Sequence, residues 1–182
     1  MTVKDVITEA AYMVGETDFA KTFAAGGEVD ADKRDAFLRC FNLTLHETAV
    51  EYLPIRKTVA AKGGKVAFSS FGFSVLRVVG VYGAGGESLD FKVFPSYIVT
   101  PPENVTVVFD AAPVDMTVDD EFVYDKTRIG KRVFACGVAS EYCLQAGRFS
   151  EAENFGRKYR AGAEGEPCRR GGRMRPLKRW GL

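Results

Sequence analysis

Hydrophobic periodicity changes twice along this sequence, and these two changes constrain the fold more than any other feature. Up to Pro54 the apolar residues recur with the helical period of about 3.6, and after Pro54 the period falls to about 2. Helical spacing returns near Thr127. Because helices and strands occupy separate blocks, we predict an α+β fold rather than a wound α/β fold. The expected order is two helices, a small antiparallel β-block at about 55–112, two helices and an extended C-terminal arm.

The N-terminal block contains two predicted helices. Apolar residues recur at helical spacing from Val3 along one face, and the run closes at Gly15. The segment 16–29 contains a Gly-Gly pair and is expected to be a connecting loop. Asp30 is placed to cap a second helix. That helix must end before Pro54, because proline disfavours helical geometry in the residue that precedes it.

The β-block consists of short runs rich in Val, Phe, Tyr and Thr, separated by Gly and Pro. Val105–Phe109 is the clearest strand, because β-branched and aromatic residues favour extended structure. The glycine-rich segment Gly80–Gly86 superficially resembles a phosphate-binding loop. It lacks the G-K-[ST] signature and a following helix, so we predict a hairpin turn. The block as a whole is expected to be built from hairpins.

The C-terminal block contains two further predicted helices. Thr127 is placed to cap the first of them, and Gly147 is suited to the position after its C-terminal end. Ser150 and Glu153 match a capping box that would start the second helix. The residues expected to end this last helix are Gly162, Gly165 and Pro167.

Charge is distributed unevenly over the 182 residues, a length typical of one domain or one domain with an appendage. The segment 168–182 contains six basic residues and no acidic residue, whereas the rest of the chain contains 19 basic and 24 acidic residues, a formal charge of −5. We therefore predict a single α+β domain at 1–167 and a basic extended arm at 168–182. The arm has too few apolar residues for a core and is expected to become ordered only on a partner.

No catalytic constellation is found. His46 lies in the middle of a predicted helix with no marked nucleophile, which is typical of a structural or surface histidine. The acidic residues between Asp115 and Asp125 could bind Mg²⁺ or Ca²⁺, but the EF-hand pattern is absent, and such residues more often solvate a loop that leads into a helix. The cysteines and one histidine do not make a zinc site. We predict no enzymatic activity, no cofactor and no metal.

The sequence also bears on the compartment. The four cysteines form no C-x-x-C pair and are expected to be free thiols in a reducing compartment. The N-terminus lacks the charged start and apolar run of a signal peptide. The most apolar stretch, Val75–Tyr82, is interrupted by Arg77 and is far shorter than the roughly 20 residues that span a bilayer. Neither secretion nor membrane insertion is expected.

The basic arm is the candidate functional site. One interpretation is a disordered, solubilising terminus that contacts nucleic acid electrostatically. The other is a docking arm, because tryptophan and arginine dominate binding hot spots and arginine pairs with acidic surfaces. The candidate docking residues are Arg169, Arg170, Arg173, Arg175, Leu177, Lys178, Arg179 and Trp180.

Four segments, taken with the predicted order of elements, suggest a family. They are Phe94–Tyr97, Thr100–Val107, Gly137–Leu144 and Pro176–Trp180. In this combination the chain resembles the head–tail connector proteins of tailed bacteriophages, also called adaptor or neck proteins. The resemblance implies a structural virion protein, assembled in the host bacterial cytoplasm, that forms a homo-oligomeric ring of about twelve copies beneath the portal.

The resemblance also implies partners. The C-terminal arm would dock on the portal protein, and the opposite side of the ring would contact tail or tail-completion proteins. DNA would pass through the lumen during genome ejection without sequence-specific binding. Two alternatives remain: a nucleic-acid-binding protein that grips phosphates with the basic arm, and an enzyme that uses the acidic residues at 115–125 with a metal.

Overall fold

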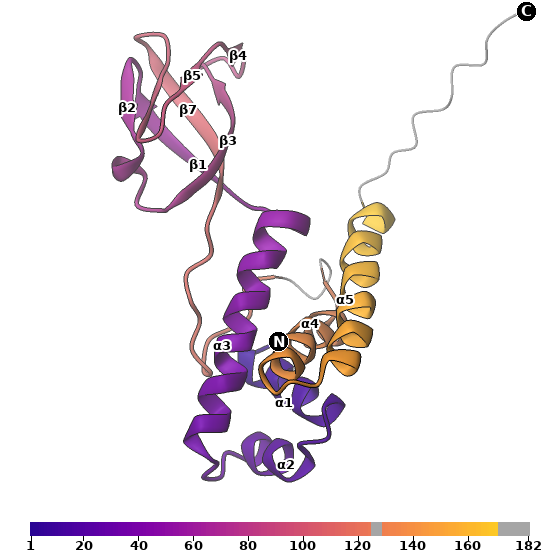
Figure 1. Cartoon of the computed structure of the whole chain (residues 1–182). Helices are drawn as coiled ribbons and strands as arrows, with labels where there is room; N and C mark the ends of the chain where they lie inside the picture. The colour runs from indigo at the N-terminus through magenta and orange to yellow at the C-terminus, as the bar shows by residue number, and fades with distance from the viewer. Residues whose placement is uncertain (125–128, 171–182) are drawn as a thin grey trace, which may run out of the picture. The chain divides into compact units, whose positions relative to one another are not determined.

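The computed structural model describes residues 1–124 and 129–170, with the backbone alone over 166–170 (Figure 1). The chain divides into two compact units. The helical unit contains Met1–Thr44 and the chain from Met116 onward, and the β-unit contains Leu45–Asp115. The α+β fold class is confirmed, because the described residues form α-helices before and after an antiparallel β-block in the sequence.

The two predicted N-terminal helices are present as α1 (Val3–Met13) and α3 (Ala31–Glu47). The side-chain Oδ1 of Asp30 accepts hydrogen bonds from the backbone N–H groups two and three residues further on, at 2.9 and 3.3 Å. Asp30 therefore caps α3 as expected. A π-helical turn, Thr48–Tyr52, follows α3 and ends before Pro54.

A short helix, α2 (Thr17–Ala25), occupies the segment where we expected a connecting loop. Phe19, Ala20 and Phe23 are buried on one side of it. These three residues form an apolar face that is too short to stand out in the sequence, and tertiary packing stabilises the helix. The helix ends at Gly26, whose φ of 76° is in the left-handed region that favours glycine.

The C-terminal block forms α4 (Lys131–Gln145) and α5 (Phe149–Arg170). Gly147 has a φ of 72° and follows the end of α4, as predicted. Thr127, the predicted cap of α4, lies outside the described residues. Among the described residues, Gly130 occupies the position before the helix.

The start of α5 differs from the predicted capping box. The helix begins before Ser150, which therefore lies inside the first turn. Arg148, the residue that precedes the helix, donates through Nε to Glu151 at 2.8 Å and through its Nη atoms to the carbonyl oxygen of Val14 at 3.1 Å. These contacts tie the start of α5 to the end of α1.

The predicted end of α5 was also wrong, because the helix continues through Gly162, Gly165 and Pro167 to Arg170. A Cβ atom added at Gly162 would lie 2.5 Å from Cγ1 of Val133 on α4, so this glycine permits close helix packing. Pro167 removes one backbone hydrogen bond, but it lies in the last turn, so only three helical residues follow it.

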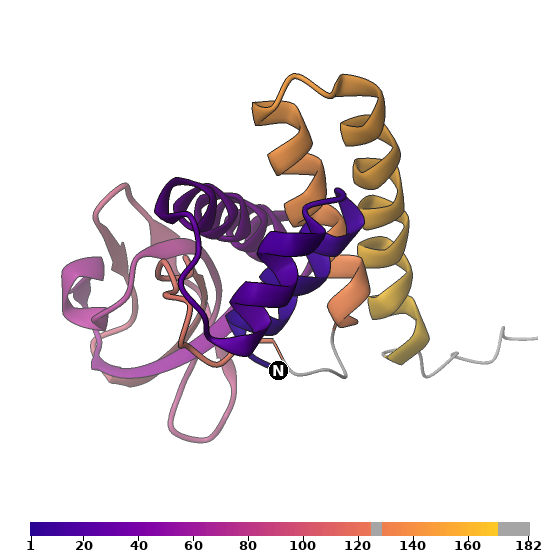
Figure 2. The same ribbon diagram turned by 90° about the horizontal axis from the view of Figure 1, so that it is seen from below.

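Small residues allow α4 and α5 to lie side by side, as Figures 1 and 2 show. A Cβ atom at Gly137 would lie 2.5 Å from Cγ2 of Thr44 and 3.1 Å from the ring of Tyr159. A Cβ atom at Gly156 would lie 3.0 Å from Oγ of Ser140. Because a Cβ atom would be too close or tightly packed at these positions, the glycines allow α5 to approach its neighbours closely.

Aromatic rings fill the core of the helical unit. The buried ring of Phe41 lies 5.7 Å from the ring of Phe122 and 5.2 Å from that of Phe134. Phe37 stacks on Tyr142 with a centroid distance of 4.1 Å. Phe122 therefore anchors the segment that precedes α4 to α3, through contacts that the sequence alone does not reveal.

The β-unit contains a four-stranded antiparallel sheet with the order β1-β7-β3-β4. Its strands are β1 (Ile55–Lys62), β7 (Asn104–Ala111), β3 (Val75–Tyr82) and β4 (Ser88–Leu89). The last strand along the chain, β7, thus lies between β1 and β3. The expectation of a sheet built from hairpins was wrong for these pairings. The strand with the most buried residues, β7, lies between β1 and β3 and pairs with both across long stretches of sequence.

A second, three-stranded sheet has the order β2-β6-β5. Its strands are β2 (Lys65–Ala67), β6 (Tyr97–Val99) and β5 (Lys92–Val93), and a 3₁₀ turn at Phe68–Phe71 follows β2. Hairpins join β5 to β6 in this sheet and β3 to β4 in the other. The core of the β-unit consists of Val66, Phe71, Val81, Ile98, Val105, Val107, Phe109 and Ala111.

Candidate functional site

One side of the four-stranded sheet is open to solvent. Side chains along β1, β7 and β3 alternate between the core of the β-unit and the opposite side, which we call the outer sheet face. The outer sheet face consists of Arg56, Thr58, Ala60, Lys62, Arg77, Gly80, Tyr82, Asn104, Thr106, Val108 and Asp110. Most of these residues are exposed, whereas Asp110 and Gly80 are buried.

An ion-pair network lies at one end of the outer sheet face. Asp110 on the central strand stands opposite Arg56 on β1 and Arg77 on β3. Nε of Arg56 donates to Oδ1 of Asp110 at 3.1 Å, and Nε and Nη2 of Arg77 donate to Oδ2 at 3.2 and 2.8 Å. The Asp110 side chain is 4% exposed, but those of Arg56 and Arg77 are 54% and 68% exposed. A buried carboxylate therefore holds two guanidinium groups that still face solvent.

Two β-bulges in β3 place Arg77 in this network. The pairing with β7 shifts between Val75 and Arg77 and again between Val78 and Gly80. Without the first shift, strict alternation would put Leu76 beside Asp110. Bulges commonly redirect a side chain in this way.

The second shift places Gly80 on the outer sheet face, where the ring of Tyr82 covers it. A Cβ atom at Gly80 would lie 3.1 Å from Cε2 and from Oη of Tyr82. The ring therefore lies along the sheet instead of projecting from it, as aromatic side chains do when they cover a strand glycine. Tyr82 remains partly exposed.

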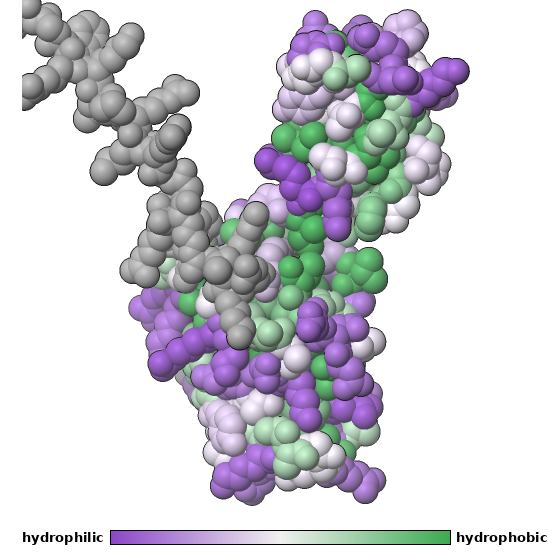
Figure 3. All heavy atoms as spheres, turned by 180° about the vertical axis from the view of Figure 1, so that it is seen from behind, coloured by the Kyte–Doolittle hydropathy of each residue, from purple (hydrophilic) through white to green (hydrophobic). Residues whose placement is uncertain are grey.

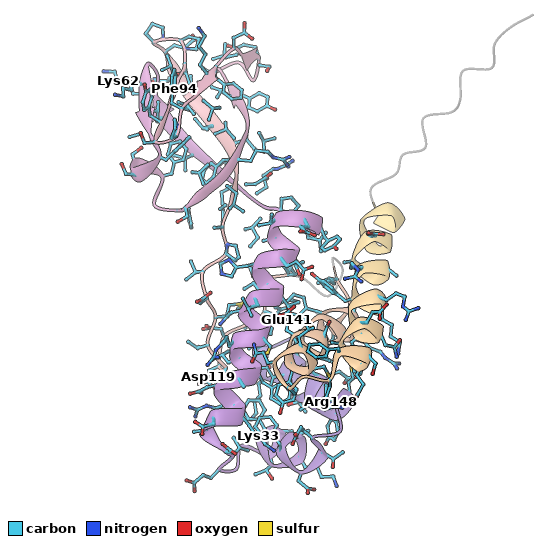
Figure 4. All side chains as sticks on the ribbon, in the orientation of Figure 1. Lys33, Lys62, Phe94, Asp119, Glu141 and Arg148 are labelled. Atoms are coloured by element: carbon cyan, nitrogen blue, oxygen red, sulfur yellow. The ribbon has the colours of Figure 1, made fainter. Side chains whose placement is uncertain are left out.

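The outer sheet face combines three cations with one buried anion. Lys62 lies at the far end of β1 from Arg56 and points away from the β-unit (Figure 4). This site was not predicted from the sequence, in which Arg77 stands out only as an interruption of an apolar stretch. The signal that could have found it is the presence of Arg77 and Asp110 inside two largely apolar strands.

The candidate docking arm is placed only in part. Arg169 and Arg170 belong to the last turn of α5, so the prediction of an extended arm from residue 168 was wrong for residues 168–170. The other predicted docking residues, Arg173, Arg175, Leu177, Lys178, Arg179 and Trp180, lie outside the described residues. Their role as a docking site stays a prediction.

The acidic residues at 115–125 do not form a metal site in the part of the chain that the structure describes, where no group of three or more potential ligands converges. Asp120 accepts hydrogen bonds from the backbone N–H and hydroxyl of Thr117, and these bonds lower the pKa of its carboxyl group. Asp115 lies 2.9 Å from Nε2 of His46. Asp125 is outside the described residues.

Other apolar side chains reach the surface of the β-unit (Figure 3). Val93, Phe94 and Val99, around the β5–β6 hairpin, are exposed. Phe94, labelled in Figure 4, stacks on Tyr97 at 4.7 Å, and Nζ of Lys65 lies 4.2 Å from the centre of the Tyr97 ring. This hairpin is therefore a second exposed surface of mixed apolar and basic character.

The glycine-rich segment Gly80–Gly86 forms the end of β3 and the connection to β4. The backbone N–H of Gly83 donates to the carbonyl of Glu87 at 2.9 Å, and that of Gly86 donates to the carbonyl of Gly83 at 3.0 Å. Gly86 has a φ of 82°. The segment is thus a turn, as predicted.

Three of the cysteines, Cys40, Cys136 and Cys143, are free and buried. Burial raises the pKa of the Cys40 thiol to about 12 and also raises the pKa of Cys136 and Cys143. Because the thiolate is the reactive form, we expect these thiols to react slowly with disulfide reagents in the folded protein. Cys168 lies in the part of α5 whose side chains are not described.

These raised pKa values predict a loss of stability at alkaline pH. Above the ordinary thiol pKa the unfolded chain releases protons that the folded chain keeps, so the free energy of unfolding falls as pH rises from about 8.5 toward 12. Each fully shifted thiol contributes up to about 1.4 kcal/mol per pH unit. Urea denaturation of wild type and Cys40→Ala at a series of pH values measures this slope. An equally steep fall in Cys40→Ala would show that Cys40 is not responsible.

No family model matches this chain, and no curated protein is similar to it at a significant level. Within residues 1–124 and 129–170, the structure has no helix with the length and apolar character that a membrane span requires.

Proposed function

We propose that this chain is a subunit of a head–tail connector in the neck of a tailed bacteriophage, with a structural rather than an enzymatic role. The order of its elements supports this proposal: a helical unit is interrupted by a β-unit and ends in a long helix followed by a basic segment. The observation that carries it is the position of α5. This helix of 22 residues is packed against α4 through glycines and leads directly into the predicted docking arm.

A rigid helix before the arm favours docking. A segment that becomes ordered on binding loses conformational entropy of its side chains and backbone. This entropy loss is smaller when the residue from which the segment starts is already held in place. Residues Arg173 to Arg179 would pair with carboxylates of the portal, and Trp180 would occupy an apolar pocket. Because a ring repeats the same contact in every subunit, weak single contacts would add to a stable attachment.

Ring formation requires two different surfaces on each subunit, because a head-to-tail interface joins unlike patches. Exposed apolar residues are available in both units, for example Val93 on the β-unit and Phe149, which is 70% exposed, on the helical unit. Val93 lies with the exposed Phe94 and Val99 around the β5–β6 hairpin, and grouped apolar residues mark interaction surfaces more often than a single one does. These surfaces would make the lateral contacts of a ring of about twelve copies.

The test mixes the full-length protein with purified portal protein encoded in the same genome. Light scattering coupled to size-exclusion chromatography measures the mass of any complex. We expect a complex in which this chain and the portal are present in equal numbers. The proposal fails if no complex forms at concentrations at which both proteins are folded. If DNA binding through the arm appears in its place, with an affinity that falls steeply with salt, the nucleic-acid-binding alternative is correct.

A further inference from the structure

We propose that the outer sheet face of the β-unit binds single-stranded nucleic acid. This inference goes beyond the connector role and concerns a different part of the chain from the basic arm. It rests on three properties of the face: arginine side chains held by a carboxylate, an aromatic ring that lies along the sheet, and small or β-branched residues between the cations.

The arginines supply donors for phosphate oxygens. Arg56 uses one N–H and Arg77 uses two N–H groups on Asp110, so most of the five N–H donors of each guanidinium are not used on this carboxylate, and both side chains are more than half exposed. Because both arginines converge on one carboxylate, their side chains are held in place before a ligand arrives. Planar guanidinium groups are suited to bidentate contact with phosphate.

The charge of the outer sheet face favours a polyanion. Arg56, Arg77 and Lys62 contribute three positive charges, and Asp110, which is buried beneath the arginines, contributes the only negative charge on the face. Arg56 and Lys62 are six residues apart on β1, which corresponds to about 20 Å at roughly 3.3 Å per residue. A stacked strand at about 3.4 Å per nucleotide would place about six nucleotides over this distance.

The ring of Tyr82 supplies a stacking surface. One side of the ring covers Gly80, and the residue is partly exposed, so its other side can accept an unpaired base. Its neighbours toward β1 on the outer sheet face are small or β-branched residues, Thr106 on β7 and then Ala60 on β1. Aromatic rings on an open sheet flanked by cations are typical of single-strand binding, where stacking tolerates any base.

A protein partner fits these observations less well. Protein hot spots are usually buried in pockets that complement a bulky anchor. The outer sheet face presents the short, exposed side chains of Thr58, Ala60 and Thr106, and none of these is a bulky anchor. An acidic protein segment is nevertheless the alternative that the test must distinguish.

The experiment measures fluorescence anisotropy of a labelled oligothymidine of about 20 nucleotides with the full-length protein at several salt concentrations. The first variant, R56Q/D110N/R77Q, replaces the ion-pair network by neutral hydrogen-bonding groups and so avoids a buried, unpaired carboxylate. We expect at least about tenfold weaker binding and a salt slope reduced by about 1.4, corresponding to two lost phosphate contacts.

The second variant, Y82L, keeps an apolar cover over Gly80 but removes the aromatic stacking surface. We expect about tenfold weaker binding with an unchanged salt slope, because stacking releases no counterions. The matched control, E153Q/R157Q/K158Q, changes the same number of cations and anions at exposed positions of α5 and should bind like wild type. All proteins retain the arm, so its contribution is the same in each.

Several results would overturn the proposal. They are an absence of oligothymidine binding by the wild type, equal losses in the control and the R56Q/D110N/R77Q variant, and equal affinity for a DNA duplex. Polyglutamate competing as well as oligothymidine would indicate an acidic protein partner instead. If the triple variant fails to fold by circular dichroism, Y82L and Lys62→Gln decide the question, and wild-type binding by both contradicts the proposal.

Discussion

Deletion of residues 171–182 is expected to abolish attachment to the portal while leaving both units folded. The deletion removes four of the arm's six basic residues together with Trp180, and it keeps α5 intact to Arg170. The aromatic anchor and each charge-assisted hydrogen bond contribute about 1–3 kcal/mol or more to the free energy of binding. Because every subunit of the proposed ring would lose these contacts together, we expect the attachment to be lost. Cosedimentation with portal protein measures binding, and circular dichroism checks the fold.

Two full-length variants separate the contributions of the arm. Trp180→Ala removes the apolar anchor, and R173Q/R175Q/K178Q/R179Q removes the charges without changing the length. We expect both to weaken portal binding by at least about tenfold, and only the charge variant to change its salt dependence. Wild-type attachment by the truncated chain would show that the arm does not dock on the portal.

Replacing Phe41 by alanine is expected to cause the largest loss of stability in the helical unit. The Phe41 ring is fully buried and contacts Phe122 and Phe134, so its removal leaves a cavity between α3, α4 and the segment before α4. Substitutions of this kind lower the free energy of unfolding by about 3–5 kcal/mol. Urea denaturation followed by far-UV circular dichroism measures the change.

Leu43→Ala is the matched control, because Leu43 lies on the same helix two residues away but its side chain is 48% exposed. We expect this substitution to change the free energy of unfolding by only about 0.5 kcal/mol. If the two substitutions have similar effects, the core described around Phe41 is incorrect.

The sequence predicted the elements whose signals are local. The apolar stripe from Val3, the cap at Asp30 and the left-handed glycine at position 147 each depend on residues within one or two turns, and each is present in the structure. The switch of period at Pro54 likewise identified the inserted β-block. These features establish the α+β class without knowledge of which elements touch.

Features that depend on distant contacts were not predictable in this way. Gly162 looks like a helix breaker in the sequence, but in the structure it makes room for Val133 on a neighbouring helix. The helix α2 has only Phe19, Ala20 and Phe23 buried, too few for a clear period. The position of β7 between β1 and β3 is determined by burial of a whole strand, and no local turn specifies it.

The outer sheet face was missed for a related reason. Arg77 reaches Asp110 only because a bulge shifts the register of β3 by one residue. Simple alternation along β3 would place Leu76 there instead. The three residues of the ion-pair network are also separated by 21 and 33 positions in the chain, so no spacing motif links them. Only a structure brings them together.

The number of copies of this chain in each purified virion is the measurement that tests the connector proposal most directly. Quantitative mass spectrometry of phage particles produced from the genome that encodes this chain compares its copy number with that of the portal protein. We predict about twelve copies per particle, equal in number to the portal subunits. A chain that is abundant in infected cells but absent from the purified particles would contradict the proposal.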